Sequence, residues 1–245
     1  MSELPLSVIQ IRENYFHTLE RIAKAARIAG RAPEDIRLVV VTKTHPIEVV
    51  IAVVEAGAKY LGENYAEEAV LKIKELPAQY VVQWHMIGHI QSRKAALVCE
   101  YFDYVHSLDS LKLATRLDRF AGEHGRKLPV LVECNLGGEA TKFGYPIWNE
   151  GLWKTILEEI AQIVELANLS VRGVMGMAPF MAIAEEARPY YRRLRLFRDF
   201  LQSRLPRVDW RELSMGMSAD FEVAVQEGAT WVRIGQSILG ARRTG

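Results

Sequence analysis

The chain has 245 residues, of which 49% are hydrophobic and 25% charged, and its formal net charge is +1. This is the composition of an ordinary globular protein, and so small a net charge excludes a general electrostatic attraction to nucleic acid or to an anionic membrane. The two cysteines, Cys99 and Cys134, are far apart and outside any CxxC pair, which excludes a disulfide framework or a cysteine zinc site.

The amino-terminal segment predicts a helix and no targeting signal. MSELPLSVIQIREN has an early Glu3 and no basic region followed by an apolar run, so we do not expect a signal peptide. Apolar residues then recur at helical spacing from about residue 6 to residue 29. No apolar run in the sequence approaches the ~18 residues of a membrane-spanning helix. We therefore expect a cytoplasmic protein with no membrane partner.

From residue 37 onward, short apolar strands alternate with amphipathic helices. Strands are predicted at 37–42, 59–62, 82–87, 103–106, 129–134, 170–175, 211–214 and 230–234, and helices at 47–56, 65–76, 110–124, 152–167, 185–205 and 220–227. Such alternation is typical of a parallel sheet covered by helices. Eight units without a Gly/Ser/Pro-rich linker predict one α/β domain over 1–245, a single (β/α)8 TIM barrel with an extra N-terminal helix. An open doubly wound sheet is the alternative, because the signals at 59–62 and 211–214 are weak.

Functional groups of such barrels lie at the carboxyl ends of the strands. A candidate for such a group is Lys43. It lies within LVVVTKTHP, residues 38–46, two positions after the apolar run of a buried strand. Lysine is almost never fully buried without a partner. Lys43 therefore either extends to solvent or reacts as a neutral amine, since desolvation lowers the pKa of a lysine.

Two segments near the end of the chain predict an anion site. LSMGMSAD (213–220) offers two hydroxyls around a glycine, and VRIGQSILG (232–240) gives Gly235 and Gln236 before a short helix. Hydroxyls and free backbone amides at a helix start bind phosphate, and barrels often bind it after strands seven and eight. The alternative is that Ser214 and Ser218 are helix caps and turn formers.

Three other features have ordinary structural explanations beside functional ones. Arg233, between two apolar strand residues, is expected to point into the barrel toward a carboxylate or a ligand atom. His85 is interpreted as a hydrogen-bonded core residue more readily than as a catalyst, and no spacing of histidines or carboxylates predicts a metal site. The arginines of 190–207 alternate with apolar residues at helical spacing and so mark a solvent face, which argues against nucleic acid.

Taken together, the strand-end motifs resemble the pyridoxal 5′-phosphate (PLP) homeostasis protein family. The motifs are VVTKTHP, GENYAEE, WHMIGHIQSRK, VHSLD, VECNLGGEATKFG, GVMGMAP and LSMGMSADFEVAVQEGATWVRIGQSILG, in that order from about residue 37 to 240. The resemblance implies the barrel fold of the alanine racemase domain, a fold-type III PLP barrel, with PLP as cofactor. Arg93 and Met86 depart from the family's usual asparagine and phenylalanine.

The resemblance also implies the roles of individual residues. Lys43 would form the Schiff base and Arg233 would lie beside the pyridine nitrogen, while Asn64 and Met215 would line the cofactor. The phosphate would be held at Ser214, Ser218 and the backbone of Gly235 and Gln236. No catalytic residue and no metal ligand is assigned.

Three functions are compatible with this site. The first is a non-enzymatic, monomeric protein that buffers or delivers PLP, with PLP, other B6 vitamers and PLP-dependent apo-enzymes as partners. The second is a PLP-dependent amino-acid racemase, and the third an unrelated Schiff-base enzyme such as an aldolase. Racemases of this fold add a C-terminal β-domain and a catalytic tyrosine from a partner subunit. This sequence ends five residues after Gly240, so we expect the first function, with His85 as the best candidate for a second base.

Overall fold

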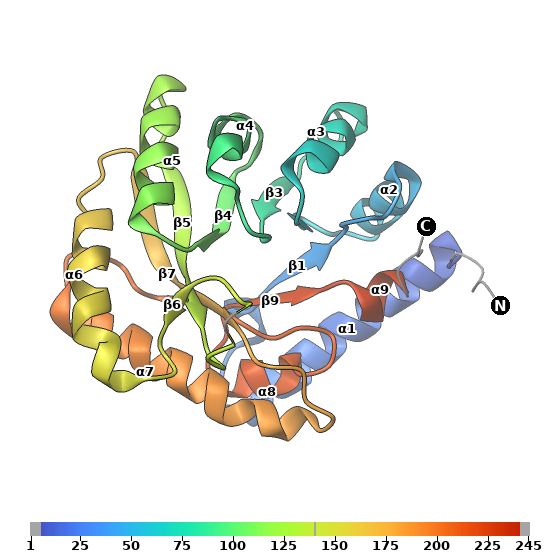
Figure 1. Cartoon of the computed structure of the whole chain (residues 1–245). Coiled ribbons are helices and arrows are strands. Elements are labelled where there is room, and N and C mark those ends of the chain that lie inside the picture. The colour runs from blue at the N-terminus through green and yellow to red at the C-terminus, as the bar shows by residue number, and fades with distance from the viewer. Residues whose placement is uncertain (1–5, 140, 241–245) are drawn as a thin grey trace.

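The computed structural model describes residues 6–139 and 141–240. In these ranges the chain forms a closed parallel β-barrel surrounded by helices (Figure 1). Its strands are β1 (Arg37–Val41), β2 (Tyr60–Glu63), β3 (Gln83–Met86), β4 (Tyr104–Leu108), β5 (Leu128–Asn135), β7 (Leu169–Met177), β8 (Glu212–Ser214) and β9 (Trp231–Ile234). Each strand pairs in parallel with the next, and β9 pairs with β1 to close the ring. The predicted TIM barrel is confirmed, and the open sheet is excluded.

The helices lie outside the strands. They are α1 (Val8–Ile28), α2 (Ile47–Glu55), α3 (Ala66–Glu75), α4 (Ala95–Tyr101), α5 (Leu111–Glu123), α6 (Trp153–Ile163), α7 (Arg188–Arg204), α8 (Phe221–Gln226) and α9 (Gln236–Leu239). The 3-10 helices are η1 (Pro33–Asp35), η2 (Ser92–Lys94), η3 (Glu150–Leu152) and η4 (Ala184–Ala187), and the two-residue strand β6 (Tyr145–Pro146) pairs with the end of β5. The predicted helices are all present. The seven-residue α4 is an addition, because it is too short for its periodicity to be recognised.

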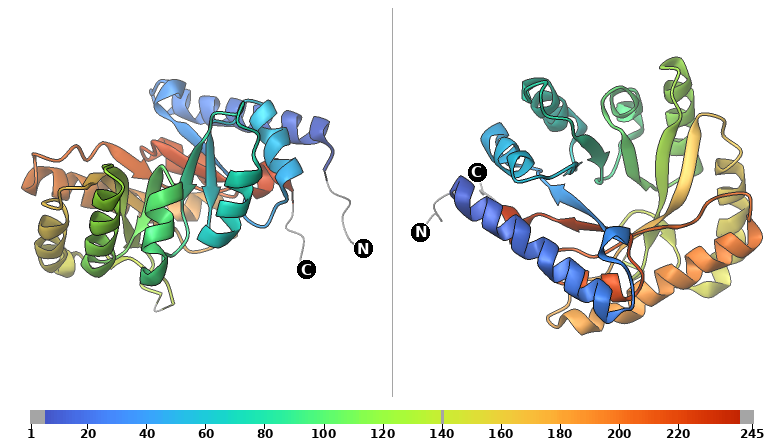
Figure 2. Two further views of the ribbon diagram at one scale, coloured as in Figure 1. Left: turned by 90° about the horizontal axis from the view of Figure 1, so that it is seen from above. Right: turned by 180° about the vertical axis from the view of Figure 1, so that it is seen from behind.

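The extra helix α1 covers the outside of the barrel where β9 meets β1. It packs against α2, α8 and α9, and both views of Figure 2 show it along one side of the molecule. An ion pair between Arg21 and Glu222 of α8, at 2.7 Å, joins the two helices. Arg31, just after α1, donates to the carbonyl oxygens of Val225 and Ala229, each at 2.8 Å. These contacts fix the segment that leads into β1. None of the helices described is long and apolar enough to cross a membrane.

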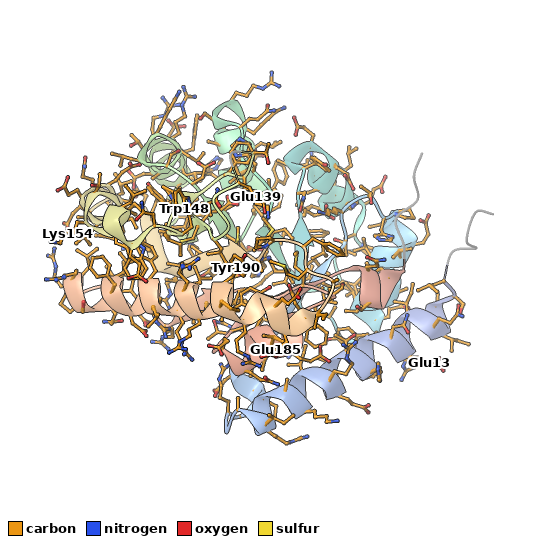
Figure 3. The ribbon with its side chains drawn as sticks, turned by 60° about the horizontal axis from the view of Figure 1, so that its bottom comes forward. Glu13, Glu139, Trp148, Lys154, Glu185 and Tyr190 are labelled. Carbon is orange, nitrogen blue, oxygen red and sulfur yellow. The ribbon has the colours of Figure 1, made fainter. Side chains whose placement is uncertain are left out.

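The basic helix α7 has the amphipathic arrangement that its sequence predicts. Its buried residues are Tyr191, Leu194, Phe197 and Leu201. At its start, Arg188 contacts Glu185 and, at 2.9 Å, Glu227, which follows α8. Figure 3 shows Glu185 at this end of α7, beside α8. The arginines of this helix therefore form ion pairs at the surface and between neighbouring helices.

The interior of the barrel is closed at its amino-terminal end by a layer of polar and aromatic side chains. The carboxylate of Glu212 accepts hydrogen bonds from Arg37 at 2.8 Å, the Tyr104 hydroxyl at 2.6 Å and the Trp231 indole at 2.7 Å. The Arg37 guanidinium also lies 3.7 Å from the centre of the Trp231 ring. Because this end is filled and its charges are paired, a ligand can reach the interior only from the carboxyl-terminal mouth.

Gly173 allows β7 to approach β8 closely. In the β5–β7 ladder, Leu131 pairs with Gly173 whereas Val130 pairs with Val171, so one extra residue is accommodated in β7. A Cβ atom on Gly173 would lie 1.9 Å from the backbone oxygen of Glu212. Because that oxygen belongs to the main chain, no side-chain rotation can relieve the overlap.

We therefore expect Gly173→Ala to lower the free energy of unfolding by at least about 3 kcal/mol. Gly125→Ala is the matched control. Gly125 also has a positive φ, 62°, but no atom lies within 4 Å of the place that a Cβ atom would take there, so the cost should be only about 1 kcal/mol. Urea denaturation of both variants measures the difference, and equal losses would show that the close approach of β7 and β8 is not required.

Candidate functional site

Lys43 lies at the barrel mouth on the loop between β1 and α2, and its side chain is half-buried. The next residue, Thr44, has a φ of 65°, the one positive value for a non-glycine residue in the described ranges. A β-branched residue disfavours this conformation, so the surroundings must hold it there. The Thr44 amide donates a hydrogen bond of 2.7 Å to Glu68 of α3, which fixes the loop on the carboxyl side of Lys43.

A buried ionic cluster fixes the other side of the same loop. The Nζ atom of Lys72 donates to the carbonyl oxygen of Thr42 at 2.8 Å, and it contacts Glu63 at 2.8 Å and Glu68 at 2.6 Å. The Thr42 hydroxyl donates to Glu63 at 2.7 Å. Burial raises the pKa of Glu63, while Lys72 and Thr42 act in the opposite direction. The backbone on both sides of Lys43 is thus held by groups from β2 and α3.

Arg233 points into the barrel, as predicted from its apolar neighbours on β9, and it is 4% exposed. Its Nη1 donates to the Ser214 hydroxyl at 2.5 Å and its Nη2 to the carbonyl oxygen of Gly176 at 3.2 Å. No ion pair with a carboxylate is found for it in the described part of the chain. A guanidinium has five donor hydrogens, so donors remain for an acceptor atom of a ligand.

Two buried histidines continue from Ser214 into the barrel. His106 Nδ1 lies 2.8 Å from the Ser214 hydroxyl, and His106 Nε2 lies 2.9 Å from His85 Nδ1. Burial lowers the pKa of His85 to about 3, helped by Arg37. Burial and the neighbouring His85 also lower the pKa of His106 well below its usual value. Both rings are therefore neutral near pH 7, and His85 is the hydrogen-bonded core residue that its strand position predicts.

The loops after β8 and β9 lie side by side at the mouth. The Ser237 amide donates to the Ser218 hydroxyl at 3.3 Å, and α9 begins at Gln236, directly after Gly235. The first amides of a helix have no acceptor within the helix. Ser218, Gly235 and Gln236 are thus brought together in an arrangement that suits an anion.

The structure places the other predicted site residues, Ser214, Met215 and Asn64, apart from this loop group. Ser214 is fully buried and pairs with Arg233 and His106 instead of joining Ser218. The Met215 side chain is fully buried in the main hydrophobic core. Asn64 is half-buried and lines a pocket of about 440 Å³. The residues Met86 and Arg93, which depart from the family motif, line the same pocket. The roles assigned to Ser214, Met215 and Asn64 remain predictions.

Glu133 is a titratable group of this site that the sequence motifs did not identify. It lies on β5, on the opposite side of the strand ring from β1, and it is 6% exposed. Its Oε2 has no hydrogen-bond partner among the described residues. Burial and the charge of Asp109 raise its pKa to about 7, although Arg233 acts against them. A single glutamate in an apolar strand gives no pattern from which this role could be predicted.

The site contains no arrangement typical of metal binding. In the described ranges, no group of three or more His, Cys, Asp or Glu side chains could hold a metal ion. Cys99 and Cys134 are buried free thiols, and burial raises the pKa of each. The chemistry of the mouth therefore depends on an amine, a guanidinium, hydroxyls, backbone amides and one carboxyl group.

Comparisons with known proteins identify the family of this chain. Residues 18–243 match the family described as "Alanine racemase, N-terminal domain". The pyridoxal phosphate homeostasis protein of Pseudomonas aeruginosa is 40% identical over 236 residues, 96% of this chain and 97% of that protein. The Escherichia coli K12 protein of the same name is 37% identical, over 95% and 97% of the two chains. The chain belongs to the pyridoxal phosphate homeostasis protein family.

Solved structures give the same result for the fold. PipY of Synechococcus elongatus with PLP bound is 35% identical, covers 91% of this chain and 99% of its own, and superposes with a TM-score of 0.76. An alanine racemase of Clostridium difficile is 18% identical, with a TM-score of 0.70, and this chain spans 57% of it. At that identity the racemase supports the fold alone.

The raised pKa of Glu133 implies a specific dependence of stability on pH. Above about pH 4.5 the carboxyl group ionises in the unfolded chain but stays protonated in the folded one up to about pH 7. Wild-type stability therefore falls as the pH rises through this window, by at most roughly 3 kcal/mol at 1.36 kcal/mol per pKa unit.

Glu133→Gln removes this penalty, so its gain in unfolding free energy over the wild type should be larger at pH 8 than at pH 5. Urea denaturation without added ligand measures the gain, and exposed Glu100→Gln is the control, for which the two pH values should agree. A gain for Glu133→Gln that does not change with pH would contradict the raised pKa.

Proposed function

We propose that the protein binds PLP as a Schiff base on Lys43 and buffers or delivers the cofactor in PLP homeostasis, without a dedicated catalytic turnover. The observation that carries the proposal is that Lys43, the buried Arg233 and the loop group of Ser218, Gly235 and Gln236 belong to the neighbouring strands β1, β9 and β8 and the loops that follow them. PipY, a family member of the same fold, has been solved with PLP bound.

The residues present fit the chemical groups of PLP. Bound PLP supplies an aldehyde that an amine can capture and a ring that withdraws electrons from it. Lys43 offers the amine, and Arg233 offers remaining N–H donors to the ring nitrogen. Ser218 and the backbone amides of Gly235 and Gln236 offer donors to the phosphate. We also propose, on the resemblance to the family, that Asn64 and Met215 line the cofactor.

Two features favour a carrier over an enzyme. Arg233 is permanently protonated and can only donate, so it leaves the pyridine nitrogen unprotonated and the ring a weaker electron sink. His85, the second base expected for a racemase, is fully buried and points its Nδ1 at His106. Its pKa of about 3 makes it a weak base. We further propose that the protein is a cytoplasmic monomer whose partners are B6 vitamers and PLP-dependent apo-enzymes.

The carrier proposal predicts a covalent adduct at one lysine. After incubation with PLP, the wild type should absorb near ~420 nm, as protonated lysine imines do, and borohydride should fix the label on Lys43 in peptide mapping. Lys43→Ala should lose both signals, whereas Lys142→Ala, a mouth-loop lysine paired with Glu139, should keep them. Absence of reconstitution in the wild type, or a label on a different lysine, would show that the assignment is wrong.

Glu133 supports racemase-like proton exchange as a second candidate function. A buried carboxyl group with a pKa of about 7 is suited to donating and accepting protons near neutral pH, and it lies across the barrel from the strand that leads to Lys43. Such an enzyme requires a base on each face of the substrate Cα.

The two candidates differ in Cα proton exchange. For the carrier, L-amino acids incubated in D₂O with the PLP-loaded protein should exchange no faster than with free PLP, as followed by proton NMR. Lys43→Ala and Glu133→Gln should then leave this background unchanged. A positioned general base contributes at least ~100-fold to a rate. Exchange well above background that falls by that order in Glu133→Gln would therefore favour the enzyme.

A further inference from the structure

A continuous chain of hydrogen bonds connects the ligand-facing arginine to the centre of the barrel. It consists of Arg233, Ser214, His106 and His85, called here the Arg–Ser–His–His chain, with successive distances of 2.5, 2.8 and 2.9 Å. Its members come from β9, β8, β4 and β3, so it spans strands on both sides of the barrel. The three inner side chains are 0% exposed, and hydrogen bonds are expected to be stronger in such an interior than in water.

The donor rules restrict the hydrogens of this chain to two arrangements. Arg233 can only donate, so the Ser214 hydroxyl oxygen must accept from it. In the first arrangement, Ser214 donates to His106 Nδ1 and His106 Nε2–H donates to His85 Nδ1. In the second, His85 Nδ1–H donates to His106 Nε2, and His106 Nδ1–H donates to Ser214, whose own hydrogen becomes free.

The two neutral histidines must therefore have the same tautomer. Mixed tautomers would place either two hydrogens or none between His106 Nε2 and His85 Nδ1, which lie 2.9 Å apart. In both arrangements the last atom of the series, His85 Nε2, has no hydrogen-bond partner among the described residues. The Arg–Ser–His–His chain is therefore anchored at Arg233. Beyond His85 it is supported by the rings of Tyr60, Tyr104 and Trp231.

We propose that His106 is a positioning residue that acts through Ser214 to hold the Arg233 guanidinium at the ring of the bound cofactor. This inference rests on the proposed function. Without His106, the Ser214 hydroxyl can rotate freely, and Arg233 keeps Gly176 as its one fixed acceptor. A buried guanidinium held at one point instead of two is less well oriented toward a ligand atom.

The variants His106→Leu and His106→Gln separate positioning from packing. Leucine fills a similar volume but interrupts the hydrogen bonds of the Arg–Ser–His–His chain. The glutamine amide has both an acceptor and a donor and can preserve them. We expect His106→Leu to weaken PLP binding about 10-fold, equivalent to about 1.4 kcal/mol, and to change the absorption spectrum of the bound cofactor. His106→Gln should recover most of both.

Tyr104→Phe is the matched control for loss of a buried hydrogen bond in the same barrel. Its hydroxyl donates to Glu212 at 2.6 Å and belongs to the amino-terminal layer, outside the chain. Thermal unfolding should show that Tyr104→Phe and His106→Leu are both destabilised. Only His106→Leu should change affinity and spectrum. Unchanged affinity and spectrum in His106→Leu would overturn the positioning role while leaving the proposed function intact, and failure of the wild type to bind PLP would overturn both.

A measurement on the wild type tests whether the Arg–Ser–His–His chain forms, without any variant. In ¹⁵N-histidine-labelled protein free of ligand, side-chain nitrogen shifts near neutral pH should show His85 and His106 neutral and in the same tautomer, either both Nε2–H or both Nδ1–H. An imidazolium at either residue, or opposite tautomers, would show that the chain does not form. This outcome would overturn the inference even if His106→Leu cannot be folded.

Discussion

Burial of the Arg233 guanidinium is the constraint on which the rest of the site depends. Removing a charge from water costs several kcal/mol even after the protein relaxes, and burial lowers the pKa of Arg233 while Glu133 and Asp220 act against it. Arg37, a half-buried arginine at the amino-terminal end of the barrel, is paired with the Glu212 carboxylate. Arg233 instead has a hydroxyl and a carbonyl oxygen as acceptors. The protein thus neutralises one end of its barrel and leaves a cation with unused donors at the other.

A second buried charge organises the mouth. Lys72 is 6% exposed and is satisfied by Glu63, Glu68 and the carbonyl oxygen of Thr42. Because its partners include the backbone next to Lys43, the energy of this cluster is coupled to the shape of the reactive loop. Removing one partner of such a cluster leaves an uncompensated charge at a cost of about 3–5 kcal/mol. The two lysines thus differ: Lys72 fixes the backbone of the loop, and in the proposed function Lys43 presents an amine from that loop.

The sequence predicted what depends on local patterns. The eight strands follow from apolar runs bounded by turns, and the direction of Arg233 follows from the alternation of side chains on β9. The meeting of Ser218 with Gly235 and Gln236 follows from barrel topology, since β8 and β9 are neighbours in the ring. The position of Lys43 after a buried strand predicted its place at the barrel mouth, whereas its role as the Schiff-base lysine came from the family resemblance and stays a prediction.

The relations that sequence reasoning missed are those between residues distant in the chain. The residues Ser214 and His106 are separated by 108 positions, and so are Tyr104 and Glu212. No spacing rule connects such pairs, because their contact depends on how the strands are staggered around the barrel. The raised pKa of Glu133 likewise results from burial among neighbours on other strands. Ser214 is an example: its motif predicted a phosphate ligand, which stays a prediction, but it gave no sign of the contacts with Arg233 and His106.

The distribution of charge explains how one site could both retain and release a cofactor. Arg233 has no ion pair with a carboxylate among the described residues, and the two histidines of the Arg–Ser–His–His chain are neutral, so in the proposed function this part of the interior favours an anionic ligand. Lys43 is in contrast half-buried at the rim, where, in the proposed function, an incoming amine can reach it. In the proposed function, retention of the cofactor then depends on the interior groups, and its exchange depends on the loop at the rim. Since the interior groups are fixed by strands and the rim by one loop, the proposed carrier function would not require the barrel to rearrange when the ligand is exchanged.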